Sequence, residues 1–323
     1  MAISPVVFCF DRRYAPFAAV ATASLAASNP YPLQIYWLVR PADAEIARHW
    51  QKVVEAPQAP VVIVAVDDSL FAGWRTEGHV SQAAYMRLLI PRLIPGPRAV
   101  YLDSDVLVVE DIRELLSADP GSAVLSGAAD VRFRDGQKPP FTPPCQDTYV
   151  NGGVLLMNLN QMRKDELLRR AVEISRAGGA GVRSHSEWIL NAYAQGRKMP
   201  MGNRYNFQVQ PYAVGKASWL RFVASRQVAI YHFPGLAKPW QKWCSPWIRK
   251  TWEDAAKGLP LEESCFNDEL GLETALHLAR IFDAGGHHRL SSGLRNSIIG
   301  ALCDCLQQDE DGEALTRAML SAI

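Results

Sequence analysis

Two aspartates separated by one residue follow a short hydrophobic segment, and their spacing suits metal chemistry. Residues 100–102 lead directly into Asp103, Ser104 and Asp105. Side chains at positions i and i+2 of an extended chain point the same way, so the two carboxylates share one side of the strand end. A divalent cation such as Mg²⁺ or Mn²⁺ relieves their repulsion and also bridges to substrate phosphates. The motif indicates a metal site, and a turn held by local hydrogen bonds is the alternative.

Two kinds of enzyme use this local pattern. In the first, a sugar is transferred from a nucleotide diphosphate that the metal holds. In the second, a phosphohydrolase of the aspartyl type, the first aspartate is the nucleophile. Residues 103–108 nearly fit the second pattern, but its later acidic pair is missing, because the pair Asp67-Asp68 lies upstream. The sequence favours sugar transfer and keeps a metal-dependent phosphohydrolase as an alternative.

A second motif carries an imidazole, a glycine and an ammonium at intervals of three residues. His232 ends a predicted strand, Gly235 follows it, and Lys238 completes the motif. An imidazole binds metals, glycine permits close approach of a ligand to the backbone, and an ammonium attracts phosphate. A structural histidine and a solvated lysine are the ordinary alternatives. The combination within one loop indicates a binding site.

The elements that position these motifs alternate between strands and helices. Strands are predicted at residues 6–10, 33–39, 61–66, 98–102, 122–128, 153–157 and 228–233. Helices are predicted at residues 16–28, 42–55, 79–93, 161–176 and 184–194. This alternation predicts an α/β fold with a mostly parallel central sheet covered by helices on both faces. Ligands of such sheets bind at the carboxyl ends of the strands, where both motifs fall.

The composition changes after Pro260. Residues 261–323 carry 4 arginines, no lysine and 11 acidic residues, so the preceding 260 residues have a net charge of +8. Apolar residues spaced by four at positions 290–306 predict a helix face. We expect one domain at residues 1–257 and a small acidic helical appendage at 258–323. The positive charge either favours an anionic ligand or is spread evenly.

The overall composition is that of a globular protein and excludes a disordered or fibrous chain. Apolar residues make up 48% and charged residues 21% of the 323 residues. The 6 cysteines show no metal-ligand spacing, which favours a reduced, cytoplasmic protein. Four tryptophans within residues 239–252 have three readings, namely core packing, stacking on acceptor sugars, and a lipid interface.

In five segments the chain resembles glycosyltransferase family 8, and in particular the bacterial lipopolysaccharide galactosyl- and glucosyltransferases. The segments are residues 8–25, 79–93, 100–107, 149–159 and 229–240. The resemblance implies a Rossmann-like nucleotide-sugar-binding fold of the GT-A type over residues 1–257. It also implies a Mn²⁺ ion, with Mg²⁺ as the alternative, a UDP-hexose donor, and retention of the anomeric configuration.

The resemblance also implies roles for individual residues. Asp103, Asp105 and His232 resemble the family's metal ligands, and Gly235 and Lys238 its diphosphate contacts.

At the nucleotide, the segment from Phe8 to Tyr14 resembles the first strand and its uracil pocket. There Asp11 would accept a hydrogen bond from the base, and Tyr14 would stack on it. Ser104 is also counted among the nucleotide-binding residues.

At the donor sugar, the resemblance implies catalytic-site positions for Arg87, Asp130 and Asn151, with Gly152 beside them. The chain departs from the family at Ser186 and Glu187, which stand where an Asp-Gln pair is usual. Front-face attack by the acceptor is the first mechanism that we consider. A double displacement with Glu187 as nucleophile is the second.

The expected partners follow from the same resemblance. They are a UDP-sugar donor and a saccharide or glycolipid acceptor such as lipopolysaccharide core, and no nucleic acid. The expected location is the cytoplasm, with peripheral contact to the inner membrane as an option. A non-catalytic nucleotide-sugar-binding protein is a further alternative. The choice between galactose and glucose and the oligomeric state stay open.

Overall fold

The structure is a computed structural model of the 323-residue chain. It describes residues 3–74, 81–133, 147–177, 186–209, 215–235, 237–241 and 244–266, with several helical residues between 275 and 299. The chain divides into two compact units, Met1–Phe266 and Asn267–Ile323. The first unit contains both motifs. The boundary expected at 257/258 stays a prediction, and most of the expected appendage lies outside the described residues.

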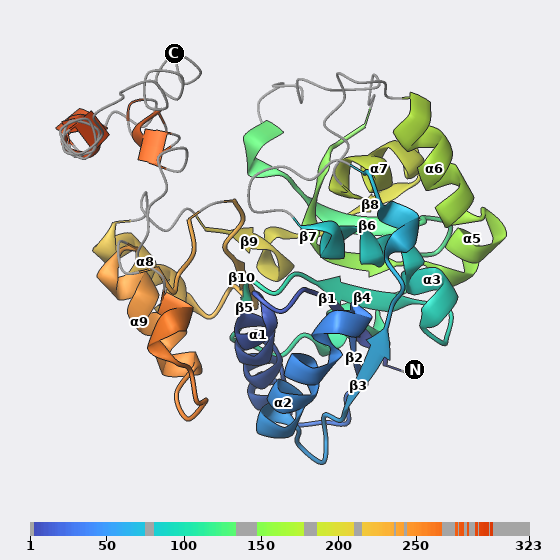
Figure 1. Ribbon diagram of the computed structural model, residues 1–323, viewed down its shortest axis with the longest axis horizontal. Coiled ribbons are helices and arrows are strands. Elements are labelled where there is room, and N and C mark those ends of the chain that lie inside the picture. Colours follow the sequence, from blue (N-terminus) through green and yellow to red (C-terminus); the bar gives the residue numbers. More distant parts are fainter. Residues whose placement is uncertain are drawn as a thin grey trace, which may run out of the picture. The chain divides into compact units, whose positions relative to one another are not determined.

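The centre of the first unit is a seven-stranded sheet with the order β3-β2-β1-β4-β7-β6-β8 (Figure 1). Its strands are β1 Val6–Cys9, β2 Ile35–Val39, β3 Val61–Ala65, β4 Ala99–Leu102, β6 Leu125–Ala129, β7 Val150–Met157 and β8 Lys198–Pro200. Strands β3, β2, β1 and β4 are mutually parallel, whereas β7 runs antiparallel to both β4 and β6. The mostly parallel sheet is confirmed. The reversed direction of β7 was not predicted from the sequence, and it decides which end of this strand lies beside the site.

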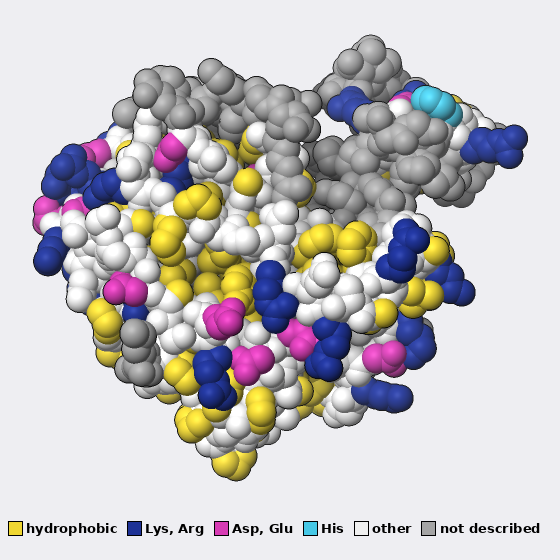
Figure 2. Space-filling view, turned by 180° about the vertical axis from the view of Figure 1, so that it is seen from behind, with side chains coloured by type: hydrophobic (Ala, Val, Ile, Leu, Met, Phe, Trp, Pro, Cys, Tyr) yellow, Lys and Arg dark blue, Asp and Glu magenta, His cyan; other side chains and the backbone are white. Residues whose placement is uncertain are grey.

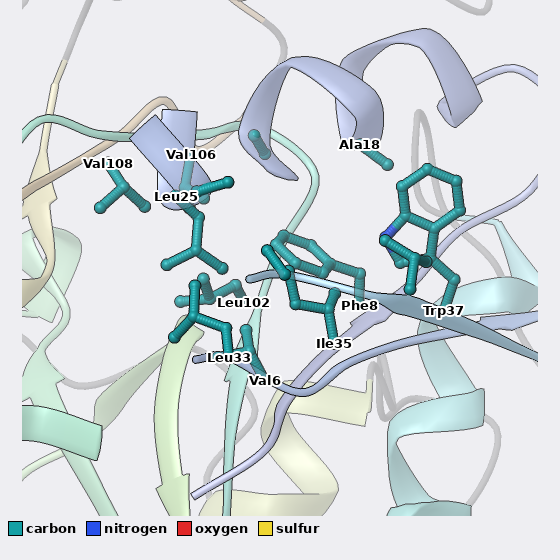
Figure 3. Packing of buried hydrophobic residues seen from close by; sticks show 14 of the residues in the cluster. Val6, Phe8, Ala18, Leu25, Leu33, Ile35, Trp37, Leu102, Val106 and Val108 are labelled. Carbon is teal, nitrogen blue, oxygen red and sulfur yellow. The ribbon is translucent and has the colours of Figure 1, made fainter. Parts of the chain in front are cut away.

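Helices cover both faces of this sheet (Figure 1). One face carries α1 Ala15–Ser28 and α2 Ala44–Val54, and the other carries η3 Gln82–Leu89, α3 Ile90–Leu93, α5 Leu159–Lys164, α6 Leu167–Ala177 and α7 Ser186–Tyr193. Strand residues alternate between the two faces. Val6 and Phe8 pack with Ile35 and Trp37 under α1, as Figure 3 shows, while Val7 packs in the opposite cluster. The buried, two-sided strands explain why they read as continuous apolar runs.

Two predicted helices differ from the structure in detail. The described part of the helix expected at 79–93 is a 3₁₀ helix, η3, followed by the short α3. The helix expected at 161–176 is two helices, α5 and α6, because Glu166 between them adopts a left-handed backbone conformation with φ 54°. A non-glycine residue in that region cannot continue a right-handed helix.

A second, three-stranded sheet lies beside the end of β4. It has the order β5-β10-β9, with β5 Val106–Val108, β9 Phe207–Gln208 and β10 Ile230–His232. Strand β10 pairs antiparallel with β5 and parallel with β9. The late strand predicted at 228–233 is confirmed as β10, whereas β5 and β9 are too short to be recognised from the sequence. This sheet carries the second motif to the first.

An aromatic cluster supports the small sheet. It includes residues of α8 Lys216–Ser225 and α9 Pro246–Ala255. The short helix α4 Arg113–Ser117 belongs instead to the core cluster of α1 and α2 on the central sheet. Phe17 stacks on Trp240 with ring centroids 3.7 Å apart, and Trp252 packs against both. The core-packing interpretation of the tryptophan-rich stretch is confirmed for Trp240 and Trp252. Trp243 lies outside the described residues.

Two surface observations complete the fold. Basic and acidic side chains are intermingled over the face seen in Figure 2, so the positive charge of the first 260 residues does not gather there in one patch. Within the described parts of the chain, no helix is both long and apolar enough to cross a bilayer.

Candidate functional site

The sheet brings most of the predicted site residues together at the edge formed by the carboxyl ends of its parallel strands. Asp103 and Asp105 follow β4, and Asp130 follows β6. Because β7 is antiparallel to β4, it begins at this edge, which places Asn151 there as well. The backbone N–H of Asp103 donates to the carbonyl oxygen of Gly153 at 2.8 Å and ties the two strands together.

Asp103, Asp105 and His232 converge on one point. One ligand atom from each residue lies within 4.8 Å of the others. His232 Nε2 is 3.3 Å from Asp105 Oδ1 and 3.9 Å from Asp103 Oδ2. The other oxygen of each aspartate faces away from the imidazole. Asp103 Oδ1 accepts from Arg87 Nη2 at 2.8 Å and from the Tyr101 hydroxyl. Asp105 Oδ2 accepts from Lys238 Nζ. Each carboxylate thus gives one oxygen to a cation and turns the other toward the imidazole.

This arrangement fits a divalent cation. Among the described residues, the buried oxygens Asp105 Oδ1 and Ser104 Oγ have no hydrogen-bond partner. Buried polar atoms are otherwise almost always paired, so an unpaired carboxylate oxygen facing an imidazole indicates a missing ligand. Two carboxylate oxygens and one imidazole nitrogen suit Mn²⁺ or Mg²⁺, with further positions left for phosphate oxygens.

Two buried cations flank the metal ligands. Lys238 is only 4% exposed and also donates to the carbonyl oxygen of Phe233 at 2.8 Å. Burial opposes the charged form of Lys238, but the Asp105 carboxylate outweighs it and raises the pKa of the ammonium. Burial likewise opposes ionisation of Asp105, but the Lys238 ammonium outweighs it and holds the pKa of this carboxyl below its ordinary value. Arg87, 5% exposed, lies 4.4 Å above the ring of Tyr101.

Glu187, the first-turn acidic residue of α7, is held on both of its oxygens. Oε1 accepts from Arg132 Nη2 at 3.0 Å and from the Tyr149 hydroxyl at 3.1 Å, and Oε2 accepts from the backbone N–H of Gly152 at 2.8 Å. Burial and the nearby Glu187 charge raise the pKa of Tyr149 well above its ordinary value, so its hydroxyl stays a donor. Ser186, beside Glu187, is buried.

Asp130 and Arg132 form a second ion pair at this end of the site. Arg132 Nε donates to Asp130 Oδ1 at 2.9 Å and Nη2 to Oδ2 at 2.6 Å, while Asn151 Nδ2 donates to Oδ2 at 3.1 Å. Burial opposes ionisation of Asp130, but the Arg132 and Asn151 hydrogen bonds outweigh it and lower its pKa. Asp130 is therefore a carboxylate that accepts hydrogen bonds.

The residues expected at the nucleotide lie at the carboxyl end of β1. Asp11 is buried and accepts from the backbone N–H of Arg13 at 2.9 Å. Tyr14 packs edge-on against Trp240, with ring centroids 6.2 Å apart. Phe8, in contrast, is fully buried in the core under α1, so its ring faces α1 instead of this edge. Gly235 has φ 84°, and apart from its chain neighbours no atom of the described residues lies within 4 Å of an added Cβ, so on this side its backbone leaves room for a ligand.

Sequence reasoning did not single out three residues of this edge, namely Arg132, Tyr149 and Asn206. Arg132 and Tyr149 stand two residues from Asp130 and Asn151, and a search for charged or hydroxyl partners around those positions would have found them. Asn206 lies next to β9, a strand too short to predict, so its sequence context carried no signal.

The comparisons with known proteins agree with this geometry. The sequence profile of the family described as Glycosyl transferase family 8 matches residues 5–244. The chain belongs to glycosyltransferase family 8. A putative glycosyltransferase of Haemophilus influenzae is 26% identical over 74% of this chain and 74% of its own length. The lipopolysaccharide 1,2-glucosyltransferase of Escherichia coli is 21% identical over 74% of this chain and 73% of its own. The match to the glycosyltransferase GlyF of Streptococcus pneumoniae spans only 52% of that protein.

Solved structures of the galactosyltransferase LgtC share the fold. The complex of LgtC with donor and acceptor sugar analogues has a TM-score of 0.70 and 25% identity, covering 80% of this chain and 98% of LgtC. An active-site variant of LgtC in which glutamine is replaced by glutamate has a TM-score of 0.69. The family resemblance and the GT-A fold are thus confirmed, and this member of family 8 is an enzyme of glycosyl transfer.

Proposed function

We propose that this glycosyltransferase transfers galactose or glucose from a UDP-hexose to a glycan acceptor, with retention and with Mn²⁺ as the preferred ion. The observation that carries the proposal is the convergence of Asp103, Asp105 and His232 between the buried cations Arg87 and Lys238. A nucleotide diphosphate needs such a concentration of positive charge when it leaves. We propose either hexose as the donor sugar, because the named relatives include a glucosyltransferase and a galactosyltransferase.

The residues around the metal ligands suit the diphosphate and the base. A divalent ion bound there supplies charge neutralisation at the leaving diphosphate. Lys238 and the open backbone of Gly235 lie in one loop and would bind phosphate oxygens. Asp11 and Tyr14, at the end of β1, would hold the uracil. Mg²⁺ suits the same oxygen-rich ligand set and is the alternative ion.

The residues around Glu187 would hold the donor hexose. Asp130, Asn151 and Arg132 are fixed to one another by hydrogen bonds and present polar atoms at the edge of the sheet. Arg132 is already neutralised by two carboxylates, Asp130 and Glu187, which favours an uncharged sugar over a uronic acid.

Front-face attack is the mechanism that the contacts of Glu187 support. The acceptor oxygen forms its bond to the anomeric carbon on the face from which UDP leaves. The bond between that carbon and the diphosphate oxygen breaks with its electron pair going to UDP, and the acceptor proton passes to the diphosphate. A nucleophilic Glu187 would instead have to release Arg132, Tyr149 or Gly152 before attacking.

The acceptor that we propose is a lipopolysaccharide-core saccharide, because one relative carries that substrate in its name. Such a glycolipid would bring the enzyme to the inner membrane from the cytoplasm by peripheral contact.

The test is transfer itself. The purified protein is incubated with UDP-galactose or UDP-glucose, Mn²⁺ and core oligosaccharides, and UDP release and product mass are measured. We expect acceptor-dependent UDP release with one hexose, an α-linked product, and loss of activity in Asp103→Asn but not in the surface variant Asp119→Asn. UDP-sugar binding without transfer to any acceptor would point to the non-catalytic alternative. Phosphate release from simple monoesters would support the alternative function, a metal-dependent phosphohydrolase.

A further inference from the structure

A line of four buried side chains connects the two ends of the site. Asn151 Nδ2 donates to Asp130 Oδ2 at 3.1 Å, and Asn206 Nδ2 donates to Asn151 Oδ1 at 3.0 Å. His232 Nδ1 then lies 3.0 Å from Asn206 Oδ1. None of the four residues is more than 2% exposed. The line thus runs from the sugar-side carboxylate to the metal-side imidazole without contact with solvent.

The donor-to-acceptor direction of the hydrogen bonds along this line is fixed at its Asp130 end. The backbone N–H of Gly153 donates to one side-chain atom of Asn151 at 3.0 Å, and a backbone amide only donates, so that atom is the oxygen. The other atom, Nδ2, faces the carboxylate of Asp130, which only accepts. Asn151 can therefore have one orientation, although the two atoms of an amide are otherwise hard to tell apart.

This orientation determines those of Asn206 and His232 in turn. Asn206 must present its NH₂ group to the oxygen of Asn151, so its own oxygen faces His232. An amide oxygen only accepts, and Nδ1 of His232 must therefore carry a proton. The neutral ring has a single N–H, so Nε2 keeps its lone pair, and Nε2 is the atom that faces Asp105 Oδ1 at 3.3 Å.

We propose that Asn206 is a positioning residue that fixes His232 in the Nδ1–H tautomer and ties the metal side of the site to Asp130. The side-chain hydrogen bonds of Asn206 go to Asn151 and His232, and among the described residues none joins it to either aspartate of the metal group. Its effect comes from the hydrogen bond on the far side of the imidazole, which sets both ring orientation and tautomer. The role rests on the proposed function, in which His232 binds the ion, whereas the tautomer assignment does not.

Two variants separate the two halves of the line. Asn206→Leu removes both hydrogen bonds at similar volume, and we expect it to weaken Mn²⁺ binding by about 10- to 100-fold. Asn206→Asp keeps an acceptor for His232 Nδ1 but presents no donor to Asn151 Oδ1. We expect Asn206→Asp to keep Mn²⁺ affinity close to that of the native protein while the Asn151–Asp130 end loses order and transfer slows.

Gln208→Leu is the matched control. Gln208 lies two residues further along the chain, in β9, and its amide accepts from the backbone N–H of Val131 at 3.0 Å and donates to the carbonyl oxygen of Ala129 at 2.9 Å. Gln208 pairs with His232 along the backbone of β9 and β10, but its side-chain amide bonds Val131 and Ala129 instead of the imidazole. Gln208→Leu therefore removes a comparable amide and leaves the contact between His232 and Asn206 in place. We expect unchanged Mn²⁺ affinity in this variant.

The experiment combines metal titration with nuclear magnetic resonance. Mn²⁺ is titrated into the nucleotide-free variants by calorimetry, after circular dichroism has established that each is folded. Long-range ¹H–¹⁵N spectra of the metal-free native protein at alkaline pH identify the protonated nitrogen of His232, assigned by its loss in His232→Gln. We expect the proton on Nδ1, and a mixture of tautomers in Asn206→Leu.

Two results would overturn the proposal. One is a native His232 protonated on Nε2, and the other is native Mn²⁺ affinity in folded Asn206→Leu. A native protein that carries the proton on Nδ1 but does not bind Mn²⁺ would contradict both the metal-positioning role of Asn206 and the metal site of the proposed function. The tautomer assignment of His232 would then still be confirmed.

Discussion

The imidazole of His232 lies directly against the backbone of Gly153. A Cβ atom added to Gly153 would be 2.1 Å from Cε1 of the ring and 2.5 Å from Nε2. The same residue accepts a backbone hydrogen bond from Asp103 at 2.8 Å. Gly153 therefore makes room for one metal ligand and holds the strand end that carries another. Any larger residue at this position must displace the imidazole, because β7 is paired on both sides in the middle of the sheet.

Gly153→Ala should weaken metal binding. The added methyl group cannot coexist with the ring, so His232 must move away from Asp103 and Asp105. We expect Mn²⁺ affinity to fall by about 10-fold or more and the free energy of unfolding to fall by about 1–3 kcal/mol. Calorimetric titration and urea denaturation measure the two effects. Gly202→Ala is the control, since within the described ranges only its chain neighbours come within 4 Å of an added Cβ there. Equal Mn²⁺ affinity in both variants would contradict the account.

Glu187→Gln should keep substantial turnover. An amide can still accept from Arg132 and Tyr149, although it loses charge and places an NH₂ group near the N–H of Gly152. We expect a moderate loss of kcat with UDP affinity unchanged, measured by steady-state kinetics. A loss of several orders of magnitude at unchanged UDP affinity would favour the covalent route through Glu187.

Asp130 should contribute stability that disappears in acid. Its pKa in the folded protein lies below the ordinary value of 3.8, because the hydrogen bonds from Arg132 and Asn151 outweigh the effect of burial. A lowered pKa stabilises the fold above the unfolded-state value, and this stabilisation is lost as the pH falls through the folded-state value.

Asp130→Asn should therefore lower the free energy of unfolding at neutral pH. Its unfolding free energy should also fall less than that of the native protein between neutral pH and about pH 3. Urea denaturation across this range measures both quantities, with the exposed Asp119→Asn as control. Identical pH slopes for Asp130→Asn and the native protein would show that this ion pair contributes nothing.

Trp240→Ala should be strongly destabilising. The indole is stacked on Phe17 at 3.7 Å and belongs to the cluster beneath the small sheet, two residues after Lys238. We expect a loss of about 3–5 kcal/mol from the cavity and the lost burial. Leu220→Ala, at a side chain 52% exposed on α8, should change stability by less than about 0.5 kcal/mol. Thermal or urea denaturation distinguishes the two, and similar values would contradict the core assignment of Trp240.

The fold was predictable where strands are buried on both faces. Strands β1, β2 and β4 are buried throughout and appear as continuous apolar runs. The half-exposed edge strand β3 is also a continuous apolar run, and the helices between these strands are enough to specify a parallel sheet. The direction of β7 was not predictable, since its apolar run is the same whichever way it runs. Strands β5 and β9 have three and two residues, too few for a periodic signal. The break at Glu166 depends on one backbone angle.

The convergence of Asp103, Asp105 and His232 followed from residue types at strand ends and from the family resemblance. The sequence could not show that Lys238 and Arg87 neutralise the outer oxygens of the two aspartates, because these contacts join segments distant in the chain. Asn206 was missed for the same reason, since its neighbours Asn151 and His232 are 55 and 26 residues away.

The most direct test of the central claim is calorimetric titration of UDP with and without Mn²⁺. It is carried out on the native protein and on a folded Asp103→Asn/Asp105→Asn double variant. The account predicts UDP binding that needs both Mn²⁺ and the two carboxylates. Absence of UDP binding in every condition, or equal binding by the double variant without Mn²⁺, would contradict it.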